Sequence, residues 1–400
     1  MRAFNVVAFL LFGLASLRAQ DEGSLLVANA TAWHSREVGD GVFLRQRWFA
    51  ALFASPQSLT VLEVRQGAAA KFDLVAPGRR TRTSVMAEQG QALAAINGGF
   101  FAIETTGLSI GLLRLDGALV VPASPGQGSL GLTADGRLQL AERPAGDWPE
   151  TFEALGAGPL LLRDGKVIDH GEGQRQRRHP RSAIGVAKDG RVLWLAVDGR
   201  TTKAAGMTFE ETARVLAALG CTDALNLDGG GSTTLWVKGH GVCNYPCDNR
   251  RYDHEGERAV ANALLLRAPA VVVVDDDDAE LAGDGWQQRA DGDHAHGRDF
   301  AVCATSGARA TFAAELPFAG RWQVLAWRPA VNAVAPTTTW RVRLPDGEGT
   351  VACTSGVGAG NWAVLGEFQR VGASRVEVVF TATLGELLLV DAVRFLQMRD

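Results

Sequence analysis

Two aspartates that follow apolar segments are the strongest candidates for chemistry in this sequence. Asp198-Gly199-Arg200 follows the apolar run 192–197, and Asp228-Gly229-Gly230-Gly231-Ser232-Thr233 follows the run 224–227. A third run, 92–96, leads into Asn97-Gly98-Gly99-Phe100. Paired carboxylates can act as nucleophile, general base or general acid. Glycines let the backbone approach a ligand closely, and their N–H groups can hold an anionic oxygen.

Asp-Gly pairs also have a purely structural explanation, because they are common turn formers. We expect hairpin turns at four others, Asp116-Gly117, Asp135-Gly136, Asp164-Gly165 and Asp189-Gly190. Three consecutive glycines after a buried strand are different, since they cost conformational entropy and add no packing. The stretch that begins at Asp228 therefore favours a functional loop.

Basic residues near position 180 suggest a site for an anion. The charged run 174–178 predicts a solvated loop. Arg181 enters an apolar strand directly, where it could clamp a phosphate with two hydrogen bonds or form a structural ion pair with an aspartate. Arg200 is a second candidate phosphate ligand. His179 could act as an acid or base, although a lone histidine before proline is more often a loop residue.

The elements around the aspartates predict how they are positioned. Thr208 and Glu211 form a capping box for a helix over 208–219, and Gly220 stands where such a helix stops. Strand 192–197, this helix and strand 224–227 predict a βαβ unit with a right-handed crossover. Parallel strands would bring both carboxylates to one sheet edge. We therefore expect an α+β or mixed α/β catalytic domain over 20–268.

Length and composition set the wider frame. The 400 residues predict two or three domains, and a net charge of −4 without a basic stripe argues against nucleic acid as a partner. Arg2, the apolar run 4–17 and Leu17-Arg18-Ala19 predict a signal peptide over 1–19; a buried N-terminal helix is the alternative. We expect an exported protein, periplasmic or secreted, whose mature chain has no membrane span.

The five cysteines are predicted to include disulfides, as is usual after export. Cys243 and Cys247 bracket a turn-like stretch and could close a small loop, and Cys303 could pair with Cys353. Cys221, just after the helix, is then expected to be a buried free thiol. A zinc site is the competing explanation, but the CxxC pairs typical of such sites are missing from the sequence.

A second domain is expected over 269–400. Its short strands, at 310–316, 322–328, 340–344, 362–368, 375–380 and 387–395, predict an antiparallel β-sandwich. The acidic run 275–278 predicts a solvated turn, with calcium binding as the alternative. Trp327, Trp340 and Trp362 could stack on sugar rings, whereas packing between the sheets is the commoner role for such residues.

The motifs of the first domain together resemble the phosphodiester glycosidase family, over roughly residues 60 to 268. Three of them are Asn97-Gly98-Gly99-Phe100-Phe101, the stretch 180–185 (Pro-Arg-Ser-Ala-Ile-Gly) and Val197-Asp198-Gly199-Arg200; the fourth is 226–233 (Asn-Leu-Asp-Gly-Gly-Gly-Ser-Thr). Stretches 157–166 and 257–264 also match. The resemblance implies hydrolysis of a sugar-1-phosphodiester, of which N-acetylglucosamine is the family's best-known sugar, to free sugar and a phosphomonoester.

The resemblance also implies roles for the motif residues. Asp228 and Asp198 become the candidates for nucleophile or base and its partner, with Arg181 as the phosphate clamp. The expected binding residues for sugar or phosphate oxygens are Asn97, Gly98, Gly99, Phe100, His179, Arg200, Asn226, Gly229, Gly230, Gly231, Ser232 and Thr233. Asp198, Asp228 and Asn226 also offer oxygen ligands suited to calcium or magnesium, but no EF-hand spacing singles out an ion.

The second domain resembles the golvesin C-terminal domain, through Val274-Asp275, the stretches 316–322 and 362–366, and Val390-Asp391-Ala392-Val393-Arg394-Phe395. This resemblance implies glycan binding, with extracellular or cell-wall polysaccharide as a partner. Two other functions stay open. One is a non-catalytic protein of glycan binding or exopolysaccharide assembly, and the other is a glycosidase or lyase acting on a cell-wall or extracellular polysaccharide.

Overall fold

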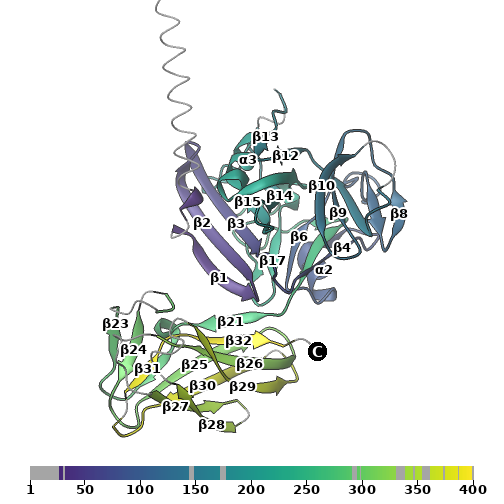
Figure 1. Cartoon of the computed structure of the whole chain (residues 1–400). Coiled ribbons are helices and arrows are strands. Elements are labelled where there is room, and N and C mark those ends of the chain that lie inside the picture. Colours follow the sequence, from purple (N-terminus) through teal and green to yellow (C-terminus); the bar gives the residue numbers. More distant parts are fainter. Residues whose placement is uncertain are drawn as a thin grey trace, which may run out of the picture. The chain divides into compact units, whose positions relative to one another are not determined.

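The computed structural model describes residues 27–29, 32–143, 148–171, 177–290, 295–297, 299–329, 338–345, 347–353, 361–372, 374–385 and 387–398. The expected signal peptide over 1–19 lies outside them. The chain divides into two compact units, one of residues 1–36 and 41–268 and one of residues 37–40 and 269–400 (Figure 1). In the described residues, no helix has the length and apolar character needed to cross a membrane.

Strands dominate the first unit. An eight-stranded sheet has the order β1 (His34–Gly39), β2 (Val42–Leu52), β3 (Ser55–Val64), β15 (Val192–Val197), β14 (Arg181–Ala187), β16 (Cys221–Asn226), β12 (Leu160–Arg163), β13 (Lys166–Val167). A second sheet has the order β10 (Leu138–Arg143), β9 (Gln127–Leu132), β11 (Glu153–Ala157), β7 (Leu113–Leu115), β8 (Ala118–Val121). A third has the order β18 (Gly241–Val242), β17 (Leu235–Val237), β6 (Ala94–Asn97), β20 (Ala263–Arg267), β4 (Lys71–Val75).

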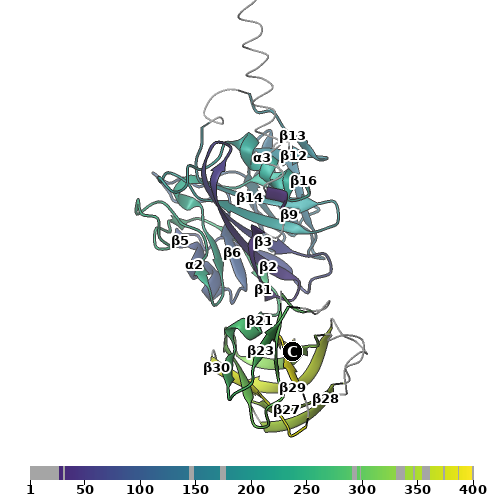
Figure 2. The same ribbon diagram turned by 90° about the vertical axis from the view of Figure 1, so that its left-hand side faces the viewer.

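The predicted βαβ unit is only partly correct. Strands β15 and β16 both pair antiparallel with β14, so they run in the same direction but are separated by it. The sheet is therefore antiparallel at these positions, although the two strands still end at one edge, as expected. Among the described residues the helices are short, α2 (Thr83–Gln89) and α3 (Phe209–Ala218) (Figure 2). The first unit is mostly β, so the expected α+β or mixed α/β catalytic domain is confirmed only in part.

Helix α3 begins as its sequence predicts. The Thr208 hydroxyl accepts a hydrogen bond from the Glu211 N–H at 3.1 Å, and the Glu211 carboxylate accepts one from the Thr208 N–H at 3.0 Å. Gly220 follows the helix with a φ of +95°. The apolar face of α3, with Ala213, Val215 and Leu216, packs against the sheet, so the helix is held by both its cap and the core.

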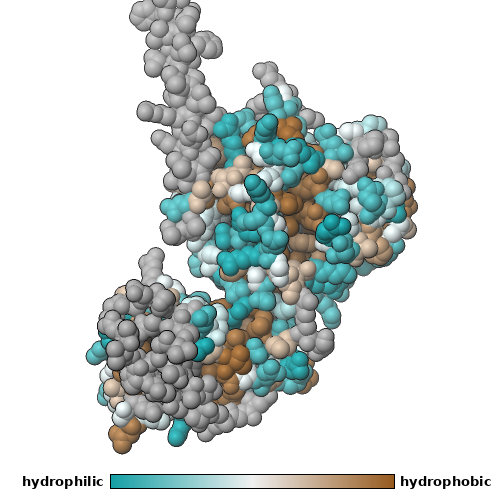
Figure 3. All heavy atoms as spheres, in the orientation of Figure 1, coloured by the Kyte–Doolittle hydropathy of each residue, from teal (hydrophilic) through white to brown (hydrophobic). Residues whose placement is uncertain are grey.

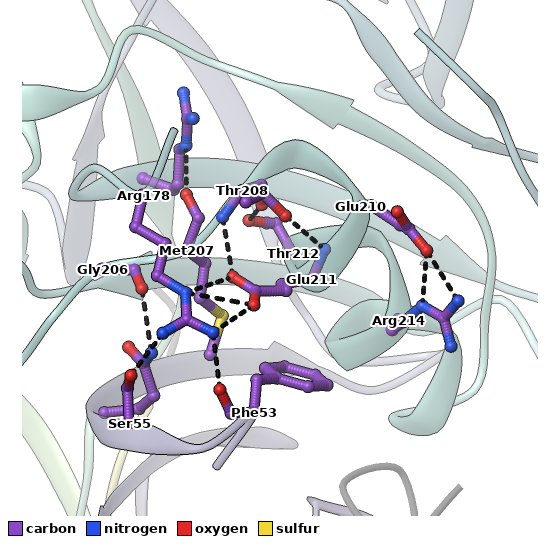
Figure 4. Close-up of polar contacts among 12 residues, drawn as sticks. Phe53, Ser55, Arg178, Gly206, Met207, Thr208, Glu210, Glu211, Thr212 and Arg214 are labelled. Carbon is purple, nitrogen blue, oxygen red and sulfur yellow. Dashed lines mark hydrogen bonds and ion pairs between the residues drawn. The ribbon is translucent and has the colours of Figure 1, made fainter. Parts of the chain in front are cut away.

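An arginine from the charged run is also fixed at this helix (Figure 4). The Arg178 guanidinium donates to both Glu211 carboxylate oxygens, with Nε at 3.1 and 3.0 Å, and to the Phe53 carbonyl at 2.6 Å. It also contacts the Ser55 hydroxyl. The expected solvated loop is therefore wrong for Arg178; residues 174–176 of that run lie outside the described residues. Arg178 joins α3 to the β2–β3 turn.

This arrangement predicts that Arg178→Ala lowers the free energy of unfolding by about 1–3 kcal/mol, since it leaves Glu211 partly buried without its cation. The matched control is Arg214→Ala on the same helix. Arg214 pairs with Glu210, whose side chain is 50% exposed, at spacing i,i+4, so its loss should cost about 0.5 kcal/mol or less. Urea unfolding of both variants measures the difference. Equal losses in the free energy of unfolding would contradict a structural role for the Arg178–Glu211 ion pair.

The four Asp-Gly pairs expected in hairpins all lie in turns. Asp116-Gly117 joins β7 to β8, Asp135-Gly136 joins β9 to β10, and Asp164-Gly165 joins β12 to β13. Asp189-Gly190 joins β14 to β15. Asp116 has a φ of 48° and Gly117 one of 78°, as a type I′ turn requires. These pairs are structural, which leaves the Asp198 and Asp228 loops to be explained separately.

The second unit consists of antiparallel sheets, as the sequence predicts. One has the order β21 (Val271–Val274), β32 (Val393–Gln397), β26 (Gly320–Trp327), β29 (Trp362–Arg370). Another has the order β22 (Glu280–Ala282), β25 (Arg309–Leu316), β30 (Ser374–Thr381), β27 (Thr338–Leu344), β28 (Gly347–Cys353), and a third β23 (Gln287–Arg289), β24 (Phe300–Cys303), β31 (Leu388–Val390). The strand expected over 387–395 is divided into β31 and β32, and Trp322, Phe312 and Phe395 are fully buried.

The predicted disulfides are not formed. Cys221, Cys243, Cys247 and Cys303 are buried free thiols, and the Cys303 thiol donates to the Asp284 carbonyl. The side chain of Cys353 lies outside the described residues. Cys221 is free as expected, and burial raises the pKa of its thiol to about 12. The Cys243 thiol instead donates to the Gly241 carbonyl.

Candidate functional site

The two aspartates lie at one edge of the large sheet, where β14 begins between the ends of β15 and β16. Arg181 pairs with Val197 and Ala183 with Asn226, so the residues after β15 and β16 flank the start of β14. The Asn244 side chain joins the two loops, since its Nδ2 donates to Asp198 Oδ1 at 3.1 Å and to the Thr233 carbonyl at 3.0 Å. The prediction that the Asp198 and Asp228 loops lie at one edge of a sheet is confirmed.

Asp198 is the enclosed member of the pair. Its carboxylate is 1% exposed and accepts three kinds of donor: the Ser58 hydroxyl at 2.6 Å, the Tyr245 N–H at 2.7 Å and Asn244. Burial raises its pKa to about 6 against these hydrogen bonds. Because Asp198 is enclosed and its two oxygens accept from these three groups, it fits a positioning role better than that of an attacking group.

Asp228 is the accessible member. Its residue is partly exposed, and burial raises its pKa to about 6, opposed by Ser232 and by the positive charge of Arg258. Its main chain is fixed, because its N–H donates to the Gly98 carbonyl at 2.9 Å and its carbonyl accepts from Asn97 Nδ2 at 2.7 Å. A carboxylate on a fixed main chain, raised in pKa and partly exposed, is suited to acid–base or nucleophilic work.

The glycines that follow Asn97 and Asp228 make room for protein groups. A Cβ at Gly98 would collide with the Asn262 amide, one at Gly99 with the Gly156 carbonyl, and one at Gly229 would lie 2.7 Å from the Pro180 carbonyl. At Gly231 the obstacle is the pair Asp248–Arg258. These glycines permit close approach of protein groups to the loops, so the expected direct contacts with ligand are not needed to explain them.

Gly230, in the loop that begins at Asp228, lies against the guanidinium of Arg200. Gly230 has a φ of +64°, and a Cβ there would lie 3.0 Å from an Arg200 guanidinium nitrogen. Arg200 itself has a φ of 63°, which is unfavourable for a side chain with a Cβ and is found where surrounding structure holds it. In the described part of the chain its guanidinium contacts His179 Nδ1 at 3.4 Å and Cys247 Sγ at 3.9 Å, and pairs with no carboxylate.

His179 is partly buried beside this guanidinium. Burial lowers its pKa, and the charges of Arg181, Arg200 and Arg177 lower it further. Its backbone pairs with Met207. A neutral imidazole next to Arg200 fits a hydrogen-bonding role at neutral pH.

The structure does not bring Arg181 to this site. Its side chain points to the α3 face of the sheet, where Nε donates to the Met207 carbonyl at 2.8 Å and Nη2 to the Arg177 carbonyl at 2.9 Å. The guanidinium also lies 4.0 Å from the centre of the Phe209 ring. Burial, followed by the charge of Arg200, lowers its pKa to about 10. The neighbouring residue Ser182 faces the other way, because side chains alternate along a strand.

The expected binding residues Asn97 and Asn226 instead fix the backbone. Asn97 is fully buried, and its Oδ1 accepts from the Ser182 hydroxyl at 2.6 Å and the Thr234 N–H at 3.1 Å. Asn226 is 2% exposed, and its Nδ2 donates to the Gly158 carbonyl at 3.0 Å. Ser232 and Thr233 are also buried, whereas Phe100 is 37% exposed. Of these residues, Phe100 alone presents a large surface to solvent.

Sequence reasoning missed the contribution of segment 244–258. Besides Asn244 and Tyr245, this segment supplies Asp248 and Arg258, which form a two-point ion pair at 2.6 and 2.7 Å beside Gly231. Tyr245 stacks on Tyr252, with ring centres 3.9 Å apart. The signal for Arg258 was its place in the motif stretch 257–264, which suggested a match but no role. Its electrostatic effect on Asp228 appears only in the folded chain.

The oxygen ligands expected in this unit, from Asp198, Asp228 and Asn226, stay a prediction. Among the described residues, the groups of acidic and histidine side chains close enough to hold one cation all lie in the second unit, and none includes Asp198 or Asp228.

The tryptophans expected to contact sugar also lie in the second unit. Trp327 and Trp362 are partly exposed, with ring centres 5.1 Å apart, and both contact His296; the Trp340 side chain lies outside the described residues. Figure 3 shows hydrophilic and hydrophobic residues interspersed on the surface.

Comparisons with known families match both units. Residues 90–267 match the phosphodiester glycosidase model, and residues 271–397 match the golvesin C-terminal domain model. The N-acetylglucosamine-1-phosphodiester alpha-N-acetylglucosaminidase of Bos taurus is 29% identical over 206 residues, which cover 44% of this chain and 38% of that protein.

Two further matches are a curated bacterial protein and a solved structure. The SPbeta prophage-derived uncharacterized protein YomE of Bacillus subtilis is 36% identical over 93 residues, or 23% of this chain and 13% of that protein. The zebrafish N-acetylglucosamine-1-phosphodiester alpha-N-acetylglucosaminidase catalytic domain has a TM-score of 0.48 at 24% identity, covering 60% of this chain and 84% of that one. The chain thus spans less than two-fifths of the length of either curated relative.

Proposed function

We propose, from the premise that residues 90–267 form a phosphodiester glycosidase domain and residues 271–397 a golvesin C-terminal domain, that this protein is an exported hydrolase of sugar-1-phosphodiesters. The family supports a glycosidase-type reaction. The signal-like segment before residue 20 supports export, and the second domain supports a glycan as part of the substrate.

In the proposed reaction, the bond between the anomeric carbon and the bridging oxygen breaks, and that oxygen leaves with the phosphate. The oxygen of a water molecule becomes the new anomeric hydroxyl, so the products are the free sugar and a phosphomonoester. The transition state carries positive charge on the sugar and growing negative charge on the leaving phosphate. The site therefore needs a carboxylate near the sugar and a cation near the phosphate.

The observation that carries the proposal is that Asp228 and Arg200 lie at the same loop, and that among the described residues Arg200 forms no ion pair with a carboxylate. Asp228 is partly exposed and begins this loop, and Arg200 lies against Gly230 two residues further on, with no carboxylate partner among the described residues. Asp228 is assigned the role of base or nucleophile. Arg200 replaces Arg181 as the proposed phosphate ligand, because Arg181 is occupied on the α3 face.

Asp198, Asn97 and Asn244 are assigned positioning roles. Asp198 orders the Tyr245 backbone and the Asn244 side chain, and Asn244 in turn holds the Thr233 carbonyl. Asn97 holds the Asp228 carbonyl. Each is buried and acts on the loop that carries Asp228, so each supports the geometry of the reacting carboxylate without touching the substrate.

Arg200→Gln is expected to lower kcat/KM for a sugar-1-phosphodiester by roughly 10²-fold, because the substrate loses a charge-assisted hydrogen bond to its phosphate. The matched control is Arg250→Gln. Arg250 is exposed and has a φ of 59°, so the two substitutions share the same residue type and backbone conformation. Steady-state kinetics of both variants test the assignment, which is refuted if Arg200→Gln and Arg250→Gln behave alike.

Release of free sugar from a panel of sugar-1-phosphodiesters tests the function itself. Each substrate is matched by a simple glycoside of the same sugar without phosphate. Hydrolysis of the phosphodiester alone supports the proposal. Hydrolysis of both members of a pair, or of polysaccharide only, favours a polymer glycosidase or lyase. A folded protein that releases no sugar and binds glycan favours the non-catalytic function.

A further inference from the structure

Five aspartates of the second unit are concentrated around the short 3-10 helix η4 (Asp276–Asp278). Oxygen atoms of Asp276, Asp277 and Asp299 all lie within 4.8 Å of one another, and an adjacent group of Asp275, His296 and Asp391 has ligand atoms equally close. No arginine or lysine of the described residues forms an ion pair with any of the five, and His296 Nδ1 lies 3.4 Å from an Asp275 carboxylate oxygen. Among the described residues the cluster therefore holds more acidic than basic side chains.

Two of these carboxylates are buried without the partners that burial demands. Asp276 is 2% exposed, and within the described structure neither of its carboxylate oxygens has a hydrogen-bond partner. Asp391 is also 2% exposed; its Oδ2 accepts from the His296 N–H at 2.8 Å, but its Oδ1 has no partner. Burial, with a smaller contribution from neighbouring aspartates, raises the pKa of Asp276 to about 7 and that of Asp391 to about 8.

Such a grouping is costly unless something compensates it. A buried carboxylate without a partner is strongly unfavourable, and like charges nearby add to the cost. The expected solvated turn over 275–278 is thus wrong at Asp276, which points inward, although Asp277 and Asp278 are exposed. A cation between the carboxylates would satisfy the unpartnered oxygens and cancel the repulsion together.

We propose that Asp276, Asp277 and Asp299 bind one calcium ion, with Asp391 and Asp275 as neighbouring charges that raise its affinity. The three ligating residues offer carboxylate oxygens only, which are the ligands that calcium prefers, and an exposed Asp277 leaves room for water in a coordination shell of six to eight. Zinc prefers sites with nitrogen or sulfur ligands, and magnesium demands a stricter octahedral arrangement.

The position of the ligands suggests what the ion does. Asp276 follows the first strand of the unit, β21, while Asp299 directly precedes β24, and Asp391 lies between the last two strands, β31 and β32. A bound ion would therefore fasten the beginning of this unit to its middle and lie beside its end. The ion is structural in this proposal, which is independent of the hydrolysis assigned to the first unit.

Calcium binding is tested on the full mature chain after treatment with a chelator, by equilibrium dialysis against labelled calcium and by calorimetric unfolding. We expect one ion bound per chain. We also expect 1 mM calcium to raise the melting temperature of one transition by at least about 3 °C, since a ligand that binds only the folded state stabilises it. An excess of magnesium should not reproduce the shift.

The key variant is Asp276→Asn, matched by Asp278→Asn on the exposed side of the same turn. Asp276→Asn should lose the bound ion and the calcium-dependent shift, yet melt in chelator at or above the temperature of the wild type, because it removes an unpaired buried charge. Asp278→Asn should bind calcium as the wild type does. No calcium bound at 1 mM, or equal binding by Asp276→Asn and the wild type, would overturn the proposal.

Discussion

Asp228→Asn is expected to lower kcat/KM for a sugar-1-phosphodiester by at least about 10³-fold, with little change in stability. The amide keeps the shape of the carboxylate but has no negative charge. It can therefore neither attack the anomeric carbon nor activate a water molecule as a base. The backbone contacts of Asp228 with Gly98 and Asn97 do not involve the carboxylate, so they survive the substitution. Single-turnover and steady-state measurements of sugar release check the loss.

Asp164→Asn is the control for this variant. Asp164 lies in a hairpin turn with a φ of 50°, a conformation that asparagine adopts readily, so activity and stability should be unchanged. The pKa of Asp228 is about 6, so its charged fraction falls as the pH drops below 6, and wild-type kcat/KM should fall with it. An Asp228→Asn variant that retains full activity would remove Asp228 from the mechanism.

Asp198→Ala is expected to have the largest effect on stability, a loss of about 3–5 kcal/mol in the free energy of unfolding. The substitution removes the acceptor for three buried donors, from Ser58, Tyr245 and Asn244, and leaves a cavity where the carboxylate was. Urea unfolding followed by tryptophan fluorescence measures the change. The activity should fall as well, because Asn244 then no longer fixes the loop of Asp228.

Asp189→Ala provides the comparison. Asp189 is 58% exposed and forms a surface pair with Arg191, so its removal should leave the free energy of unfolding essentially unchanged. If Asp198→Ala is as stable as Asp189→Ala, the buried network does not hold this edge of the sheet. If it is stable and inactive, Asp198 takes part in catalysis directly.

The sequence was sufficient where the structure depends on near neighbours in the chain. The capping box of Thr208 and Glu211 and the type I′ turn at Asp116-Gly117 form within a few residues, so residue types alone predicted them. The β-strands of the second unit followed from short apolar alternation in the same way. The family resemblance, carried by motifs whose order is fixed in the sequence, was confirmed for both units.

Tertiary structure decided which way each side chain faces and what lies opposite it. Arg181 turned to the α3 side because it is out of phase with Ser182 on β14, and its distance in sequence from Asp228 gave no sign of this. The insertion of β14 between β15 and β16 likewise depends on long-range pairing, which strand patterns alone do not encode.

The same holds for charge and burial. Asp198 and Asp228 are equivalent in sequence, each following an apolar strand, yet Asp198 is enclosed by Ser58 and Asn244 while Asp228 stays partly open. Asp276 and Asp278 belong to one acidic run, but one is buried and the other exposed. The sequence determined which groups are present and how their strands begin and end. Only the fold, by bringing distant segments together and excluding water, decided which of these groups are free to react or to bind.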